Sequence, residues 1–300
     1  MSPARSQAAT LITSALLRKW PLPRVHPKLG KEGRGDVLVI GGSVQIPGAV
    51  TLAALGALRA GAGRLQIATA RASAGHVAVA VPEARVIGLP TTRKGELAAG
   101  CHRILAREVE AADALLLGPG MCDEGAAVDL IRRSAGSRGR ASLVVDAAAL
   151  RLFARRKPLS PSYLGEAIAT PHSGEMAELW GCSRDQVLAR PLQIAREAAA
   201  QLNVVIALKG AQTFVVAPDG TAYRNTAGNA GLGTSGSGDT LSGVIAGLCA
   251  RGATALQAAV WGVYLHAKAG DLLARRIGAL GYLARELLTE IPQLMVKIAR

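Results

Sequence analysis

Residues 233–240 read GTSGSGDT, and an apolar segment with helical character, LSGVIAGLC, follows at residues 241–249. Glycines and hydroxyl side chains surround one carboxylate, Asp239. An Asp before a helix commonly caps it, because its side chain accepts hydrogen bonds from the first backbone N–H groups. The same N–H groups also bind anions, and glycines let a phosphate approach them closely. The stretch therefore predicts either a capped helix start or an anion site in which Asp239 is a base for phosphoryl transfer.

Two common phosphate-binding loops are excluded. The chain has no G-x-x-x-x-G-K-[ST] sequence, which P-loop proteins require. Gly231, Gly233 and Gly236 satisfy G-x-G-x-x-G, but a dinucleotide-binding fold also needs an acidic residue about twenty positions later. No Asp or Glu occurs between Asp239 and Asp271, so that interpretation fails.

A repeated unit runs through the chain: a short apolar run, a loop with Gly, Pro or Asp, and then a helix-like segment. The apolar runs are DVLVIGGS (36–43), RLQIATA (64–70), ADALLLGPG (112–120), ASLVVDAAAL (141–150), EAIATPHSGE (166–175) and VVIALKGAQT (204–213). Several lack alternation, which is typical of strands covered on both faces. We therefore expect one α/β domain over residues 1–300, with a mostly parallel sheet and helices on both faces. Residues 1–27 are expected to form an N-terminal helix or extension.

Ligands of such sheets bind beyond the carboxyl ends of the strands. The loops at those ends carry residues 41–43, residues 118–120, Asp146, His172 and Lys209. Each is weak alone, because glycines at strand ends often form turns and a single His is often structural. Since one edge of the sheet would hold them all, together with residues 236–239, we expect one site there.

Composition restricts the class of protein. The net charge of +14 is compatible with an anionic partner. Nucleic acid is not expected, because only 3% of the residues are aromatic, too few for base-stacking platforms. The four cysteines have no C-x-x-C spacing, which is typical of reduced thiols in the cytoplasm. No apolar stretch is long enough to cross a membrane. The acid-free N-terminus is expected to be an ordinary first helix rather than a transit peptide.

Longer motifs carry a family resemblance. The chain contains, in order, KEGRGDVLVIGGS, LLLGPG, ATPHSGEMAEL, ALKGAQTFV, YRNTAGNAGLGTSGSGDTLSGVIAGL, VYLHAKAGD and GYLARELLTEIP. From about Lys28 to Pro292 it resembles the ADP-dependent NAD(P)H-hydrate dehydratases of the ribokinase-like superfamily. The combination of TPHSGE, KGAQT and GNAGLGTSGSGD is specific, since a general ribokinase relative would share only the G-x-G-D element and a loose acidic motif.

The resemblance implies a ribokinase-like fold and a cofactor-repair reaction. The S-form of NADH hydrate or NADPH hydrate would be dehydrated to NADH or NADPH, with ADP consumed and AMP and phosphate released. The ring hydroxyl would first be phosphorylated, and phosphate would then leave as the ring nitrogen supplies electrons. Mg²⁺ would assist the reaction. The sequence does not decide whether ADP or ATP is the phosphoryl donor, and no residue indicates which of the two hydrates is preferred.

The resemblance also implies site residues. Asp239 would take the proton from the substrate hydroxyl. The anion site would comprise the N–H groups of Gly236, Ser237 and Gly238. The nucleotide would be bound by Lys209, Gly210, Ala211, Gln212, Thr213 and Gly238. The hydrate would be bound by Ala49, Gly120, His172 and Asp239. Glu175 would organise Mg²⁺ through water, or would be a first-turn carboxylate that favours its helix dipole.

One segment departs from the family pattern. Relatives usually carry a second acid or a glycine, and an Asn, around Asp146, where this chain reads DAAALR. Asp146 is therefore left out of the predicted catalytic set. The stretch before residue 28 is too short for the epimerase domain that is fused to some relatives, so a separate NAD(P)H-hydrate epimerase is an expected partner. A homotetramer is expected from the resemblance.

Three alternative functions stay open. A kinase of the same superfamily that acts on a vitamin-precursor alcohol would share the base, the anion site and the fold, although TPHSGE and KGAQT argue against it. A catalytically silent nucleotide sensor would be favoured by loss of Asp239 or of the glycines, and neither is lost. Nucleic-acid binding is the third, and the scattered basic residues disfavour it.

Overall fold

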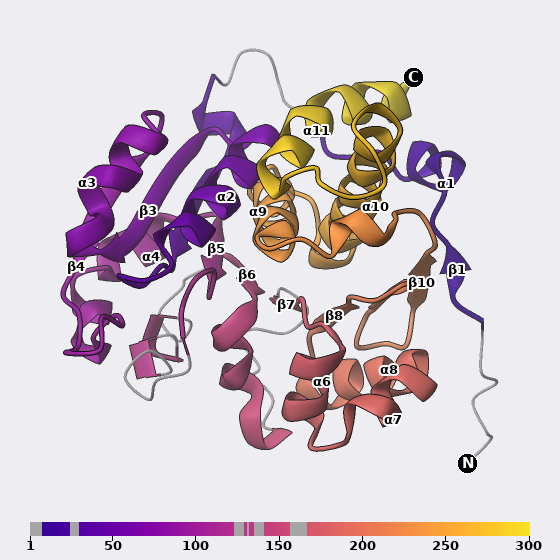
Figure 1. Ribbon diagram of the computed structural model, residues 1–300, viewed down its shortest axis with the longest axis horizontal. Coiled ribbons are helices and arrows are strands. Elements are labelled where there is room, and N and C mark those ends of the chain that lie inside the picture. Colours follow the sequence, from indigo (N-terminus) through magenta and orange to yellow (C-terminus); the bar gives the residue numbers. More distant parts are fainter. Residues whose placement is uncertain (1–7, 25–29, 123–128, 131, 135–140, 157–166) are drawn as a thin grey trace.

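The structure is a computed structural model that describes residues 8–24, 30–122, 129–130, 132–134, 141–156 and 167–300. Ten strands form one sheet (Figure 1). They are β1 (Thr10–Leu11), β2 (Asp36–Ile40), β3 (Arg64–Ala70), β4 (Arg85–Leu89), β5 (Ala114–Leu117), β6 (Ser142–Val145), β7 (Ala167–Ala169), β8 (Val205–Leu208), β9 (Thr213–Val216) and β10 (Ala222–Asn225). Their order across the sheet is β1-β10-β9-β8-β7-β6-β5-β2-β3-β4. β9 is antiparallel to both neighbours and the other described pairings are parallel, which confirms the predicted, mostly parallel sheet.

Helices cover both faces of the sheet, as predicted (Figure 1). One face carries α1 (Ser14–Lys19), α2 (Pro47–Arg59), α3 (Arg71–Ala80), α9 (Ser237–Ala250), α10 (Ala255–Arg276) and α11 (Ala284–Ala299). The other carries α4 (Ala106–Ala111), α6 (Ser173–Trp180), α7 (Arg184–Ala189), α8 (Pro191–Leu202), and the 3-10 helices η3 (Ala99–Arg103) and η4 (Ala147–Arg156). Two further 3-10 turns, η2 (Glu32–Arg34) and η6 (Ala230–Leu232), lie in loops.

The two apolar layers explain the unbroken apolar runs. Along β2, Val37 and Val39 belong to the layer under α2 and α9, whereas Leu38 and Ile40 belong to the opposite layer. A strand buried on both faces needs an apolar side chain at nearly every position. The six predicted strand runs correspond to β2, β3, β5, β6, β7 and β8.

α9 is packed tightly against α2 and α10 (Figure 1). Residues 240–250 contain no charged residue and all are buried, as expected for a helix surrounded by protein. A Cβ atom at Gly243 or Gly247 would collide with the carbonyl oxygen of Ala53 or Ala57 in α2. The absence of side chains at these glycines therefore sets how closely α9 approaches α2, and with it the position of the α9 N-terminus.

The N-terminal segment differs in part from the predicted helix. Thr10 and Leu11 form β1, which pairs with β10 at the edge of the sheet, and the helix α1 that follows is only six residues long. Trp20 then stacks on Tyr223 with ring centroids 5.8 Å apart. Its carbonyl oxygen accepts a hydrogen bond from Trp261 Nε1 at 2.9 Å. The described part of this segment is thus integrated into the domain, and an amphipathic pattern alone did not reveal the strand.

No helix in the described ranges combines the length and the apolarity that a membrane span requires.

Candidate active site

The loops that follow the parallel strands meet at the carboxyl ends of those strands, as the sequence predicts. The Gly42 N–H, after β2, donates to the Pro119 carbonyl, after β5, at 2.7 Å. Asp146 N–H, after β6, donates to the Leu117 carbonyl at 3.0 Å. Residues 172 and 209, after β7 and β8, form an isolated parallel bridge. A Cβ at Gly118, whose φ is +118°, would collide with the Asp146 carbonyl oxygen, so this close approach requires glycine.

The first turn of α9 lies at the same edge. Gly236, with φ 86°, is the N-cap of this helix, and Asp239 is its third residue. The interpretation of Asp239 as an N-cap is therefore wrong. First-turn N–H groups have no intrahelical acceptor, which makes this turn a suitable place for an anion. Of the three predicted donors, the Ser237 N–H already donates to the Thr234 carbonyl at 3.2 Å.

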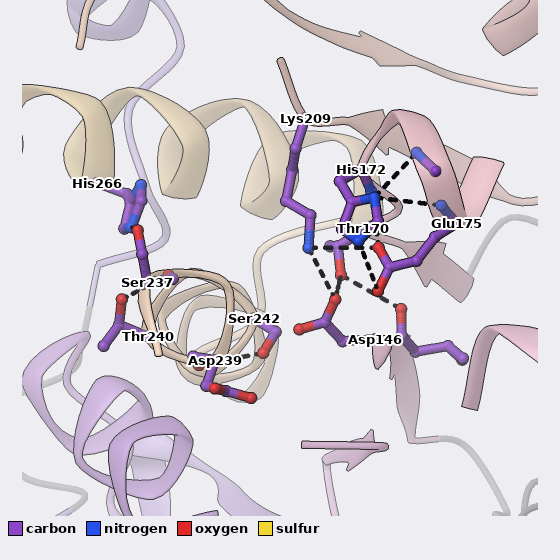
Figure 2. A network of polar contacts seen from close by, with 12 residues as sticks. Asp146, Thr170, His172, Glu175, Lys209, Ser237, Asp239, Thr240, Ser242 and His266 are labelled. Atoms are coloured by element: carbon purple, nitrogen blue, oxygen red, sulfur yellow. Dashed lines mark hydrogen bonds and ion pairs between the residues drawn. The ribbon is translucent and has the colours of Figure 1, made fainter. Parts of the chain in front are cut away.

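A buried ion pair lies directly beside this helix start. Lys209 Nζ is 3.0 Å from Asp146 Oδ1 and 3.9 Å from Glu175 Oε2 (Figure 2). Asp146 also accepts a hydrogen bond of 2.7 Å from the Thr170 hydroxyl, and its side chain is only 3% exposed. A Cβ built on Gly238 would lie 3.2 Å from the Lys209 ammonium. The Lys209 side chain therefore lies against the proposed phosphate-binding turn.

The electrostatics of this cluster suit Asp239 to be a base. Burial, together with the charges of Asp146 and Glu175, raises the pKa of Asp239 to about 7 against an opposing effect of Lys209. A general base works best when its pKa is near the operating pH. Burial lowers the pKa of Lys209, but Asp146, Glu175 and Asp239 outweigh that effect and the net shift is upward. Lys209 is therefore a permanent cation between the acids.

His172 and Glu175 form a capping box at the start of α6. His172 Nδ1 accepts hydrogen bonds from the N–H groups of Gly174 at 3.0 Å and Glu175 at 3.2 Å. Glu175 Oε2 in turn accepts from the His172 N–H at 2.7 Å. Glu175 thus lies in the first turn of α6, and its role toward Mg²⁺ stays a prediction. Because Nδ1 is an acceptor, the proton of a neutral His172 is on Nε2, and the side chain is 59% exposed.

His266, which lies in the VYLHAKAGD motif but is not among the predicted site residues, packs against the start of α9. Its Nε2 is 3.1 Å from the Ser237 hydroxyl (Figure 2). Burial lowers the pKa of His266 to about 4, despite the opposing effect of a hydrogen bond with Ser237. The imidazole is therefore neutral at pH 7. It contacts the first residue of α9 without adding charge to the site.

A cavity of about 980 Å³ opens next to this turn. Its lining includes predicted nucleotide-binding residues: Lys209, Gly210, Ala211, Thr213 and Gly238. His172, Ser237 and His266 line it as well. Gln212 is absent from the lining, and its side-chain oxygen accepts from Arg224 at 3.4 Å.

Ala49 and Gly120 lie together on the α2 side of α9, outside this cavity. A Cβ on Gly120 would be 2.9 Å from the Cβ of Ala49. On the same side, a Cβ on Gly236 would collide with the side chain of Leu52, one turn further along α2. The predicted nucleotide-binding residues and these two predicted substrate-binding residues thus flank the first turn of α9, where Asp239 lies.

A sequence profile of the NAD(P)H-hydrate dehydratase family matches residues 37–293. The chain belongs to this family. It is 47% identical to the ADP-dependent (S)-NAD(P)H-hydrate dehydratase of Xanthomonas campestris pv. campestris, over 96% of this chain and 97% of that protein.

Two solved structures are similar over nearly the whole chain. One is the ADP/ATP-dependent NAD(P)H-hydrate dehydratase of Bacillus subtilis, co-crystallised with ATP and Mg²⁺, with a TM-score of 0.81 and 29% identity over 97% of this chain and 99% of that chain. The other is a ribokinase-like superfamily protein from Enterococcus faecalis V583, with a TM-score of 0.84 and 27% identity over 100% of this chain and 99% of that chain. The predicted family and the ribokinase-like fold are confirmed.

Asp146 belongs to the charged centre, although this chain departs from the family pattern around it. Its carboxylate is the nearest acid to Lys209 and raises the pKa of Asp239. Ala147, the next residue, has φ 49°, in the left-handed region that residues with a Cβ rarely adopt. Strained backbone concentrates at functional sites. The only sequence signal for a role of Asp146 is its position at the end of a strand. The predicted set omits it because residues 147–151 differ from the family pattern.

The donor set fits Mg²⁺ held mainly by phosphates and water. No group of three or more His, Cys, Asp or Glu side chains in the described residues is placed to hold a metal ion. Mg²⁺ commonly takes one or two carboxylates and completes its shell with substrate phosphates and waters. Asp146 and Glu175, which both contact the Lys209 ammonium, supply the hard oxygen atoms that such an ion prefers.

Proposed function

We propose that this protein is an ADP-dependent NAD(P)H-hydrate dehydratase, a carbon–oxygen lyase that repairs reduced nicotinamide cofactors. It converts the S-form of NADH hydrate or NADPH hydrate back to NADH or NADPH, and it converts ADP to AMP and phosphate. The observation that carries this proposal is the position of Asp239. This base lies in the first turn of α9, between a cavity lined by residues of the KGAQT loop and the paired Ala49 and Gly120.

The residues divide the reaction into two steps. Asp239 accepts the proton of the ring hydroxyl while that oxygen attacks the terminal phosphorus of ADP, and AMP leaves. The N–H groups at the start of α9 and the Lys209 ammonium balance the negative charge that spreads over the transferring oxygens. The ring nitrogen then donates its electron pair, the carbon–oxygen bond breaks, and phosphate departs with the former hydroxyl oxygen. Loss of a proton from the neighbouring ring carbon then restores the carbon–carbon double bond of NADH or NADPH.

Mg²⁺ bound to the nucleotide phosphates would neutralise part of their charge. Asp146 and Glu175 are the residues that would hold its water shell. Lys209 pairs with both of these acids. The proposed roles thus account for a lysine that contacts two carboxylates and whose pKa is raised by a third, Asp239.

The direct test supplies NADPH hydrate, Mg²⁺ and either ADP or ATP, and follows the absorbance of the reduced nicotinamide. We expect recovery that requires a nucleotide and forms AMP and phosphate when ADP is the donor. If absorbance does not recover with either nucleotide while a vitamin-precursor alcohol is phosphorylated, the protein is a kinase. We also propose a cytoplasmic homotetramer that acts beside a separate NAD(P)H-hydrate epimerase, which the family resemblance suggests.

The rate is expected to rise with pH through about 7. Because burial raises the pKa of Asp239 to about 7, only roughly a tenth of the base is deprotonated one pH unit lower. kcat/KM measured between about pH 5.5 and 8.5 should therefore fall close to tenfold per pH unit on the acid side. A rate that is flat down to pH 5 would contradict a base with a raised pKa.

His172→Asn should weaken the hydrate more than the nucleotide and spare the fold. Asn is a good N-cap, so it preserves the cap of α6 that His172 Nδ1 provides, but it removes Nε2. The loss of one ligand hydrogen bond costs about 1–3 kcal/mol, which would appear as a higher KM for the hydrate. His172→Ala, the matched control, should in addition lower the melting temperature. Equal losses of hydrate and ADP affinity in His172→Asn would contradict the substrate role.

A further inference from the structure

Asn225 has an unpaired hydrogen-bond acceptor next to the nucleotide loop. It ends β10, opposite Thr213 of β9, and it is 3% exposed. Its Nδ2 donates to the Ala227 carbonyl at 2.9 Å. A carbonyl oxygen only accepts, so this contact fixes the orientation of the amide. Oδ1 is buried and has no hydrogen-bond partner among the described residues.

Asn229 has the complementary defect, an unpaired donor. Its Oδ1 accepts from the Gly231 N–H at 3.0 Å and from the Tyr282 hydroxyl at 2.9 Å. The Gly231 N–H only donates, so the amide orientation is again fixed. Nδ2 is buried without a partner in the part of the chain that the structure describes. Leaving such a group unpaired is costly in a folded protein, so each unpaired atom calls for a partner, either a ligand or a buried water.

Both residues line the cavity of about 980 Å³ that Lys209, Gly210, Ala211 and Thr213 also line. Under the proposed function, the phosphates of ADP would lie at the end of that cavity formed by Gly238 and Lys209. The phosphates of ADP are mostly deprotonated at neutral pH and are acceptors, so they do not supply the proton that Asn225 Oδ1 needs. The donors of ADP are the exocyclic amine of adenine and the ribose hydroxyls.

We propose that Asn225 and Asn229 recognise the nucleoside half of the nucleotide, with Asn225 Oδ1 accepting one of its protons and Asn229 Nδ2 donating to one of its ring nitrogens or hydroxyl oxygens. This inference rests on the proposed function, because it assigns the cavity to ADP. It makes the two amides the determinants of which nucleoside diphosphate the enzyme accepts. An adenine edge offers a donor beside an acceptor, and so does a ribose hydroxyl.

The test changes the ligand first, so it does not depend on a variant that folds. Calorimetry would compare ADP with 2′-deoxy-ADP, 3′-deoxy-ADP and purine riboside diphosphate, which lacks the exocyclic amine. We expect one analogue to bind roughly three- to tenfold more weakly than ADP, which is the effect of one neutral hydrogen bond. In Asn225→Leu, that analogue should bind as tightly as ADP. The comparison of two ligands on two proteins is a double-mutant-type cycle, in which a loss of the difference reports direct contact. The analogue that loses affinity distinguishes base from ribose.

Asn229→Asp is the second variant. It keeps the oxygen that Gly231 and Tyr282 contact, and it replaces the donor by an acceptor. ADP should bind about tenfold more weakly or worse, whereas pyrophosphate should be affected no more than in Asn203→Asp. That control makes the same charge change at the C-cap of α8. Repulsion between the new carboxylate and phosphate would weaken pyrophosphate as much as ADP.

The proposal is overturned if all analogues bind as tightly as ADP. It is also overturned if the analogue loses as much affinity relative to ADP in Asn225→Leu as in the wild type. It is also overturned if Asn229→Asp weakens pyrophosphate as much as ADP. In each case the unpaired atoms hold buried water instead. ADP-dependent recovery of NADPH in the wild type shows separately that the proposed function stands. A wild type that binds no ADP and recovers no NADPH would remove both.

Discussion

Asp239→Asn is expected to abolish turnover, to spare nucleotide binding and to raise the melting temperature above pH 7. A positioned base contributes roughly 10²–10⁴-fold to a proton transfer, and Asn cannot accept the proton. Removal of a negative charge beside the phosphates should leave ADP affinity equal or higher. The helix start survives, because Gly236 and not Asp239 caps α9.

The gain in stability follows from the direction in which folding moves the pKa. The pKa of Asp239 is raised from 3.8 to about 7 in the folded protein, so ionisation of this carboxyl opposes folding. Its contribution to the free energy of unfolding is most favourable at low pH. That contribution declines as the pH rises from about 4 to about 7, by about 1.4 kcal/mol for each pH unit. Asn at residue 239 lacks this cost at pH 8.

Asp185→Asn is the matched control for Asp239→Asn. Asp185 lies in the first turn of α7 and is exposed. Its substitution should lower the melting temperature slightly, through the loss of a helix-dipole interaction, and leave kcat unchanged. An Asp239→Asn protein with near-native kcat, or one destabilised at pH 8, would contradict the assignment of Asp239 as a base of raised pKa.

Lys209→Met should cost both stability and activity. It leaves Asp146 buried without its cation, and loss of one partner of a buried pair typically costs about 3–5 kcal/mol. Turnover should fall steeply, because the phosphoryl charge loses its nearest cation. Lys209 lowers the pKa of Asp239, so any residual activity should require a higher pH than in the wild type. Chemical denaturation and a pH–rate profile would measure both effects.

Two further variants separate the buried pair from a general effect of lost charge. The double variant Lys209→Met/Asp146→Asn should recover much of the stability without recovering turnover, because the uncompensated carboxylate is gone. Arg132→Met removes an exposed ion pair with Asp129, whose side chains are 62% and 54% exposed, and should cost less than about 1 kcal/mol. A Lys209→Met protein as stable as Arg132→Met would contradict the structural role of the pair.

The sequence predicted the strands and the edge of the sheet because both follow from local patterns. Strands buried on both faces leave unbroken apolar runs, and parallel strands bring their carboxyl ends together. The contacts of Asp146 did not follow, because Lys209 and Thr170 lie 63 and 24 residues away from it. His266 is similarly 29 residues from Ser237. No spacing rule connects such partners until the sheet places them.

The start of α9 could not be located from residue types alone. Asp239 and Gly236 are both plausible N-cap residues, and the structure places Gly236, with its left-handed φ, at the N-cap. The same holds for Ala147, whose left-handed backbone is unexpected for a residue with a Cβ. Backbone conformations of this kind depend on packing across the whole sheet edge.

The central claim is that a kinase-like site phosphorylates the ring hydroxyl and so makes it a leaving group. NADPH hydrate prepared in ¹⁸O-labelled water carries the label in that hydroxyl. Turned over with ADP in unlabelled water, it should release phosphate that contains one ¹⁸O atom, because the carbon–oxygen bond breaks after the phosphorus–oxygen bond has formed. Mass spectrometry of the phosphate measures this directly. Unlabelled phosphate, with the ¹⁸O in water, would show that ADP hydrolysis and dehydration are separate events and would contradict the account.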